Sequence, residues 1–171
     1  QMNNVQYFGR GPEENYRDRR TSQFIGEYTT PIKDLYEPYI RPQENEHRTD
    51  IYWCALTTKQ KAGLLFIADR TFELNASNYL LGSLDSGETI DNGAPRTNET
   101  NHRHLTDPQP VKQVDMFIDY RMMGVGGDNS WGAIAHEPYL IRPGVENAIE
   151  YGFSIVPFDK KADYKNLIYQ Y

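Results

Sequence analysis

The chain has 171 residues, enough for one domain with its own core, and its formal net charge of −6 lacks the basic surface that a nucleic acid partner requires. Cys54 is the only cysteine, so neither an intrachain disulfide nor a multi-cysteine metal site can form. No apolar run approaches the roughly 20 residues needed to cross a bilayer, and the start at Gln1 shows no signal-peptide pattern, so we expect a soluble protein without a membrane partner.

The N-terminal part predicts short strands and tight turns. Thirteen tyrosines, thirteen glycines and ten prolines favour an all-β fold over long helices. Val5–Phe8 predicts a strand that enters a sharp turn at Gly9–Pro12, a segment that we do not expect to continue as a helix or a central strand. Adjacent carboxylates in Glu13–Arg20 cannot face each other across a substrate, so we favour a loop locked by salt bridges over a catalytic pair.

The middle of the chain contains the clearest pair of strands. Ser22–Thr30 is a weakly patterned strand that Pro31 interrupts. Ile51–Leu56 and Gly63–Ile67 are short apolar and aromatic runs joined by a polar connector, which predicts a hairpin buried on at least one face. Trp53 lies inside the first run, so we expect a core tryptophan rather than a platform for a ligand.

A strand, a helical turn and a polar loop follow. Phe72–Ala76 predicts a further strand, Asn78–Leu81 favours the start of a helical turn, and Gly82–Asn101 is polar with strong turn signals. His102 and His104 alternate, so both would point to one side of a strand. A metal site needs a third protein ligand that no nearby pattern supplies, so we favour structural hydrogen bonding for both histidines.

A glycine-rich segment follows the next predicted strand, Val111–Met123, whose residues alternate between two faces. Glycine permits positive φ angles, and short polar side chains bond to nearby amides, so this segment is typical of a loop that holds an aromatic side chain out on a rigid base. The candidate residues are Trp131, Asp128, Asn129 and Ser130 for contact with a ligand, and Gly124, Gly126 and Gly127 for the shape of the loop. The three polar residues could meet a ligand directly or, as we prefer, support the indole.

The last predicted strand runs from Ile149 to Ile155 and precedes Pro157. We therefore expect a β-sandwich domain over residues 1–157. Residues 158–171 are polar with scattered apolar side chains, which favours either a short packed helix or a tail.

Four segments, taken in order, resemble the C-terminal small-chain domain of the large multidomain β-galactosidases of the glycoside hydrolase family 2 type. They read Tyr-Phe-Gly-Arg-Gly-Pro-Glu-Glu-Asn-Tyr-Arg-Asp-Arg at 7–19, Tyr-Glu-Pro-Tyr-Ile-Arg-Pro-Gln-Glu-Asn at 36–45, His-Arg-His-Leu at 102–105 and Met-Gly-Val-Gly-Gly-Asp-Asn-Ser-Trp at 123–131. The chain departs from the family pattern at Glu46, where the family loop normally continues into a glycine, and at Asn129, which replaces the second aspartate of a pair.

The resemblance implies an antiparallel β-sandwich of the supersandwich type shared with galactose mutarotases, of which this chain holds the C-terminal portion. It also implies retaining hydrolysis of terminal β-galactosides such as lactose, with two catalytic glutamates, and with magnesium and sodium sites, on an upstream barrel. This chain would then hold no catalytic residue and no metal, and would be inactive alone. Its partners would be the galactoside, which Trp131 would help to bind, the upstream domains and a further copy of the enzyme, in the bacterial cytoplasm or periplasm.

Two other classes of function stay open at this stage, a stand-alone carbohydrate-binding module and a purely structural or assembly domain. A nucleotide site is disfavoured, because no helix N-terminus and no Lys-Ser or Lys-Thr pair follows the glycines, and because Asp128 would repel a phosphate.

Overall fold

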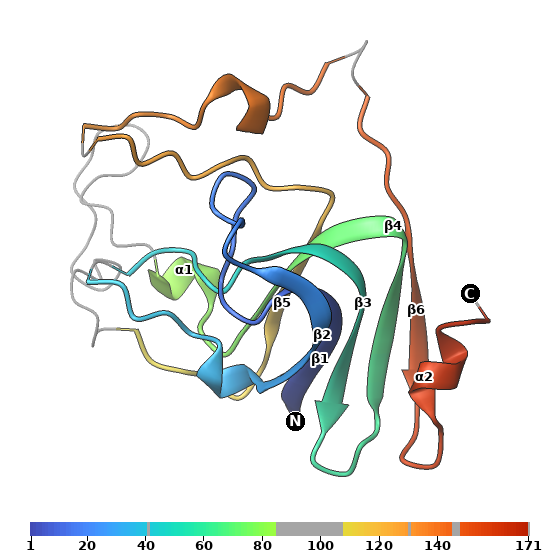
Figure 1. Ribbon diagram of the computed structural model, residues 1–171. Helices are drawn as coiled ribbons and strands as arrows, with labels where there is room; N and C mark the ends of the chain where they lie inside the picture. Colours follow the sequence, from blue (N-terminus) through green and yellow to red (C-terminus); the bar gives the residue numbers. More distant parts are fainter. Residues whose placement is uncertain (41, 85–107, 130, 145–147, 171) are drawn as a thin grey trace.

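The computed structural model describes residues 1–40, 42–84, 108–129, 131–144 and 148–170, and strands dominate them (Figure 1). This predominance of strands confirms the all-β prediction. No helix within these ranges is long and apolar enough to cross a membrane. The elements are β1 (Met2–Gly11), β2 (Phe24–Pro31), β3 (Arg48–Thr58), β4 (Gly63–Ser77), β5 (Asp115–Asp119) and β6 (Phe153–Phe158), the short helices α1 (Leu81–Leu84) and α2 (Tyr164–Leu167), and the 3-10 turns η1 (Ile32–Asp34) and η3 (Glu137–Tyr139).

The six strands of the described residues form one antiparallel sheet, in which five follow the order β2-β1-β3-β4-β5 and β6 also pairs with β4. The 15 residues of β4 make this strand long enough to pair with two others along the same edge. Its first half pairs with β6, with Leu65 opposite Val156, and its second half pairs with β5, with Leu74 opposite Ile118. The predicted hairpin is confirmed as β3 and β4, although both strands are longer than the apolar runs that indicated them.

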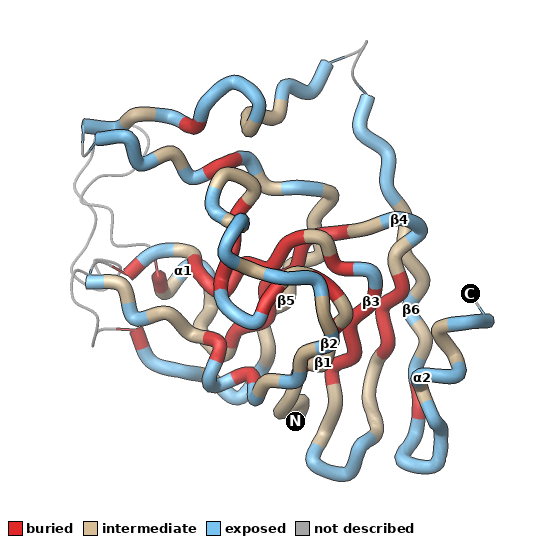
Figure 2. The backbone as a smooth tube through the Cα atoms, viewed as in Figure 1, coloured by how far each residue is buried: buried red, intermediate tan, exposed pale blue. Residues whose placement is uncertain are grey.

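Side chains alternate across the sheet and build a separate apolar cluster on each face, which gives the domain its sandwich-like layers. Cys54 and Leu56 of β3 belong to the larger cluster, together with residues of β1, β4 and η1. Trp53 and Ala55 belong to the smaller cluster, which α2 covers with Tyr164 and further side chains. Trp53 is 7% exposed, so its predicted place in the core is confirmed. Figure 2 shows buried stretches along β1, β3 and β4 and exposed stretches at the ends of the hairpins.

The predicted turn at Gly9–Pro12 is wrong, because β1 continues through Gly11 and lies between β2 and β3. The glycines serve close approach rather than a turn. A Cβ on Gly9 would lie 2.5 Å from Ile51 Cδ1 and 2.9 Å from the Asp50 carbonyl oxygen, so only a residue without a side chain fits against β3 here.

The extents of the last two strands also differ from the predictions. Val111–Met123 forms a strand only over β5, since pairing with β4 ends at Asp119 and the Met122 amide donates to the Glu73 carboxylate instead. β6 passes through Pro157, which is tolerated because this strand pairs with β4 alone among the strands described. The 158–171 segment contains α2, in agreement with a short packed helix, and the domain boundary after Pro157 stays a prediction.

The polar segment that begins at Gly82, between β4 and β5, is described only at its start. The helical turn expected at Asn78–Leu81 is observed slightly later, as α1. Most of Gly82–Asn101 lies outside the described residues, and so do His102 and His104, whose proposed hydrogen bonding remains untested.

Candidate functional site

The glycine loop, residues 124–132, leaves the sheet after β5 and is held at its base by a carboxylate from a distant part of the sequence. Asp18 Oδ1 accepts a hydrogen bond from the Val125 amide at 3.1 Å, and Asp18 Oδ2 accepts one from the Gly126 amide at 2.9 Å. The Gly124 amide donates to the Tyr139 carbonyl oxygen at 2.9 Å. One carboxylate thus binds two successive amides, an arrangement in which each hydrogen bond is strengthened by charge.

The three predicted loop-shaping glycines are required for two different reasons. A Cβ on Gly124 would lie 2.4 Å from Asp18 Oδ2, so this glycine lets the carboxylate reach the loop. Gly126 and Gly127 have φ angles of 71° and 103°, in the region that L side chains rarely adopt. Gly132, with φ 86°, belongs to the same set, although the sequence pattern did not single it out.

The tip of the loop presents the predicted tryptophan. Trp131 is 93% exposed. Its amide donates to Asn129 Oδ1 at 2.8 Å, so Asn129 supports the loop in the way that we preferred for the polar residues. Ser130 lies outside the described residues.

Asp128 contacts a neighbouring side chain while remaining exposed. Its Oδ2 atom is hydrogen-bonded to Nε2 of His136, and both side chains are largely exposed. The hydrogen bond and the negative charge of Asp128 raise the pKa of His136, so the pair links the tip to the segment that returns from it. Asp128 and Asn129 therefore both have a structural partner in addition to any contact with a ligand.

Asp18 is positioned by a tight turn that belongs to the first family-like segment. Tyr16 and Arg19 exchange backbone hydrogen bonds of 3.2 and 2.8 Å, which places Arg17 and Asp18 at the tip of the turn. The Tyr16 ring stacks on the His47 ring at 5.1 Å between centroids. The predicted salt-bridged loop at Glu13–Arg20 is confirmed by the ion pairs of Arg19 with Glu14 and of Arg20 with Asp50.

A buried polar cluster lies below this turn. It comprises Glu14, Asn15, Glu46, His47, Glu73 and Asn75, none more than 8% exposed. Asn15 Oδ1 accepts from the Thr49 amide and hydroxyl at 3.1 and 2.6 Å, and the Asn15 amide group donates to two carbonyl oxygens of its own segment. The Glu14 carboxylate accepts hydrogen bonds from the Arg19 guanidinium group, the Tyr39 hydroxyl and, at 2.7 Å, the Glu46 amide. These bonds join the first two family-like segments to each other.

The contacts of His47 within this cluster favour its charged form. Its Nδ1 atom lies 2.7 Å from Asn75 Oδ1, and its Nε2 atom lies 2.9 Å from Glu73 Oε2. Since Asn75 uses its nitrogen to donate to the Asn45 carbonyl oxygen, its oxygen faces His47 and both ring nitrogens must donate. Burial opposes the charged form, but the hydrogen bond and charge of Glu73 outweigh it and raise the pKa of His47.

Glu73 connects this cluster to the glycine loop. The same oxygen that binds His47, Oε2, also accepts a hydrogen bond from the Met122 amide at 2.5 Å, two residues before the loop begins. The loop is therefore fixed at two points, by Asp18 and by Glu73, and neither residue was identified from the sequence.

Glu46 occupies a backbone position that favours glycine. Its φ angle is 70°, at the point where the family pattern has the glycine that this chain lacks. The side chain is buried, and Glu46 Oε1 accepts from the Ser77 hydroxyl at 3.0 Å, while Oε2 has no hydrogen-bond partner in the described structure. Burial raises the pKa of Glu46 to about 8.

Among the described residues, no three His, Cys, Asp or Glu side chains lie close enough together to hold a metal ion. The carboxylates of Glu14 and Glu73 are engaged with arginine, histidine and backbone groups, an arrangement that is suited to fixing a loop.

Comparisons with known proteins agree with the four family-like segments. The family described as "Beta galactosidase small chain" matches residues 1–155. The curated relatives include the β-galactosidases of Priestia megaterium, 32% identical over 82% of this chain, Vibrio cholerae, 32% identical over 81%, and Streptococcus thermophilus, 30% identical over 82%. The matched regions make up 11–12% of the length of these relatives.

Proposed function

Because the chain belongs to the β-galactosidase small-chain family, we propose that it works as one domain of a longer retaining β-galactosidase and places Trp131 against the galactoside. The observation that carries this proposal is an almost fully exposed indole on a loop that is fixed at its base by Asp18 and Glu73. An exposed indole would be of little use to the fold, whereas it suits a face of C–H groups such as that of galactose.

The rigid base explains how a loop can contribute to substrate binding. A side chain that is ordered before the ligand arrives loses less conformational entropy on binding. Asn129 holds the Trp131 amide directly, and Asp128 holds the returning segment through His136. In this proposal Asn129 and Asp128 orient the indole, and Ser130 stays a candidate for contact with a sugar hydroxyl.

The chemistry itself is assigned to the rest of the longer enzyme. The nucleophile and the acid–base glutamate would lie on an upstream barrel, as would the magnesium and sodium sites, and the 171-residue chain would not hydrolyse a galactoside. Lactose as a substrate and assembly into a homo-oligomer belong to the same proposal. The relatives, which are several times longer than this chain and are named β-galactosidases, support this division of labour.

The test is Trp131→Ala in the longer enzyme, assayed with lactose and a chromogenic β-galactoside. We expect KM to rise by roughly 5- to 150-fold, which corresponds to about 1–3 kcal/mol, with the fold unchanged. Tyr169→Ala is the matched control, since Tyr169 is also an exposed aromatic side chain, at 88%, and follows α2 rather than standing on the glycine loop.

Two outcomes would contradict the proposal. Unchanged kinetics for Trp131→Ala would favour a purely structural or assembly domain. Saturable binding of galactose or lactose by the 171-residue chain alone, followed by indole fluorescence, would favour a stand-alone carbohydrate-binding module.

A further inference from the structure

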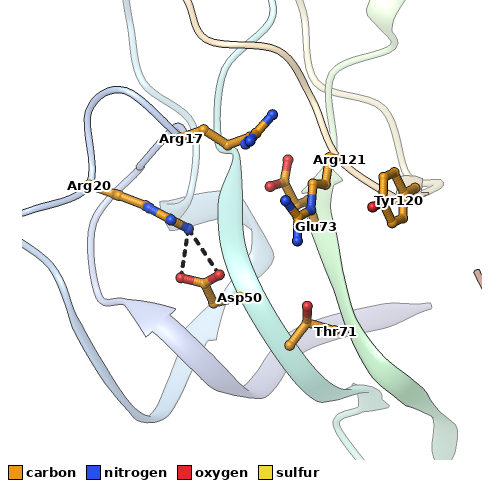
Figure 3. Close-up of a pocket in the computed structure, with 7 residues that line it drawn as sticks. All are labelled: Arg17, Arg20, Asp50, Thr71, Glu73, Tyr120 and Arg121. Atoms are coloured by element: carbon orange, nitrogen blue, oxygen red, sulfur yellow. Dashed lines mark hydrogen bonds and ion pairs between the residues drawn. The ribbon is translucent and has the colours of Figure 1, made fainter. Parts of the chain in front are cut away.

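A recess lies beside the Asp18 turn, between that turn, the sheet and the segment that follows β5. The arginine pocket, as we define it, is lined by Arg17, Arg20, Asp50, Thr71, Glu73, Tyr120 and Arg121 (Figure 3). Its cavity volume is about 40 Å³. One water molecule needs roughly 10–15 Å³ on this measure and a drug-sized ligand needs far more, so this recess suits one small chemical group.

The first carboxylate in the wall is already neutralised. Asp50 Oδ2 accepts from Arg10 Nε at 2.8 Å and from Arg20 Nη1 at 2.9 Å, and Asp50 Oδ1 also accepts from Arg20 Nη1 at 2.9 Å. Two guanidinium groups thus surround one carboxylate, which leaves this side of the pocket with one positive charge in excess.

The second carboxylate, that of Glu73, is paired with the buried His47 imidazole. Glu73 Oε2 lies 2.9 Å from His47 Nε2, and the contacts of both ring nitrogens favour a protonated imidazole here. The Met122 amide occupies the same carboxylate oxygen. Glu73 therefore brings no net negative charge to the pocket.

Two further arginines carry charge without a carboxylate partner among the described residues. Arg17 makes a long hydrogen bond, 3.5 Å, to the Pro138 carbonyl oxygen, and Arg121 lies over the Tyr120 ring at 5.3 Å. Figure 3 marks hydrogen bonds between Arg20 and Asp50 and none from Arg17 or Arg121 to any residue drawn. A chain of net charge −6 thus collects an excess of positive charge in one recess.

We propose that the arginine pocket binds one oxyanion, a carboxylate, sulfate or phosphate group, between Arg17 and Arg121. A guanidinium group offers donors in a planar fork that matches the oxygens of such groups. Thr71 and Tyr120 line the same recess, and each carries a hydroxyl group that is able to donate a hydrogen bond. This site is separate from Trp131 and does not depend on the proposed function. The oxyanion belongs either to a small molecule or to an acidic side chain of the longer enzyme.

The test titrates the 171-residue chain with sodium sulfate and with sodium chloride at matched ionic strength, following the arginine Nε–Hε signals by NMR. We expect a saturable response to sulfate alone, weakened at least tenfold in Arg121→Gln and in Arg17→Gln. Arg121 is exposed, so its substitution should leave the fold intact even if that of Arg17 does not.

Lys59→Gln is the matched control for loss of one positive charge, because Lys59 is exposed in the connector between β3 and β4. An equal response to chloride, an equal weakening in Lys59→Gln, or equally tight binding of neutral galactose would overturn the proposal. Trp131→Ala should leave sulfate binding unchanged, so this inference and the proposed function can fail independently.

Two further arms identify the source of the oxyanion. If it comes from a small molecule, acetate or galacturonate should compete with sulfate in the longer enzyme as it does in the 171-residue chain. If it comes from an acidic side chain of the longer enzyme, the pocket there should not respond to sulfate, and Arg121→Gln should lower the melting temperature of that enzyme.

Discussion

The two tryptophans of this chain lie in regions that are held together by different forces. Trp53 is 7% exposed in a strand and packs against Ala55, Leu65 and other apolar side chains. Trp131 is 93% exposed on the glycine loop, whose fixed points are the carboxylates of Asp18 and Glu73. The same side chain thus stabilises the fold in one place and is presented to solvent in the other.

The difference teaches that backbone context, rather than residue type, decides what an indole does. An alternating apolar strand buries every second side chain, so Trp53 enters the core together with Ala55. Three positive-φ glycines turn the loop away from the sheet, and hydrogen bonds replace apolar packing as the means of fixing it. If this comparison is right, the two regions should respond differently to truncation, pH and backbone substitution.

Trp53→Ala should have the largest effect. Truncation of a buried aromatic side chain costs about 3–5 kcal/mol, because packing is lost and a cavity remains, whereas Trp131→Ala should change the free energy of unfolding by less than about 0.5 kcal/mol. Urea unfolding of both variants measures the difference, and each variant leaves one indole as its own fluorescence probe. Similar losses for the two variants would show that the glycine loop is part of the core.

Stability should fall with rising pH because of the polar cluster. Burial raises the pKa of Glu46 from 4.5 to about 8, so its folded state holds a proton that the unfolded chain releases. The contribution is fully present below pH 4.5 and decreases by up to about 1.4 kcal/mol per pH unit as the pH rises towards 8. His47 acts in the same direction, since its raised pKa makes its contribution decrease as the pH rises above 6.5.

Glu46→Gln isolates the first of these two effects, because glutamine can still accept from the Ser77 hydroxyl but cannot ionise. The difference in unfolding free energy between the variant and the parent chain should grow in favour of the variant between pH 5 and pH 8. Parallel curves from urea titrations at each pH would mean that Glu46 does not hold its proton in the folded state.

Asp18→Ala should release the glycine loop while the core around Trp53 stays folded. The carboxylate accepts from the Val125 and Gly126 amides, and its loss should cost about 1–3 kcal/mol, expressed as local opening. Hydrogen exchange should become faster at these two amides and stay unchanged at Leu65. Asp34→Ala is the control, since Asp34 is an exposed acid that pairs with Lys33.

Much of the fold could be predicted because it follows local patterns. The strand pair around Trp53 was identified by its short apolar runs, and the two faces of β5 were identified by its alternation. The end of β1 was misplaced, because Gly9 was interpreted as a turn residue although it lies against the backbone of Asp50 and Ile51. A sequence pattern shows that a glycine is present, but it does not show which neighbour comes too close for a side chain.

The candidate site could be predicted only at its tip. Three glycines followed by Trp131 indicated an exposed indole from local sequence alone, and the structure places that indole in solvent. Asp18 is 107 residues from the Val125 amide that it binds, and no spacing rule connects the two. Glu73 lies inside a strand, where its contact with Met122 depends on how β4 and β5 meet. A departure from the family glycine at Glu46 was the one available signal for the buried polar cluster.

Gly127→Ala should have a smaller effect than loss of the Asp18 carboxylate, and it tests the loop backbone alone. Gly127 has a φ angle of 103°, and a Cβ at this position would meet nothing within 4 Å, so any loss comes from the backbone angle rather than from a clash. We expect a cost of about 1–2 kcal/mol, relieved in part if the loop changes shape and moves the Trp131 indole.

Gly144→Ala is the control, since Gly144 also has open space around it but has no positive φ angle. When Trp53→Phe removes the other indole, the fluorescence of Trp131 should therefore change with Gly127→Ala and not with Gly144→Ala. Equal behaviour of the two variants would mean that the loop does not need its left-handed turn, and the contacts of Asp18 and Glu73 would then account for the presentation of the indole.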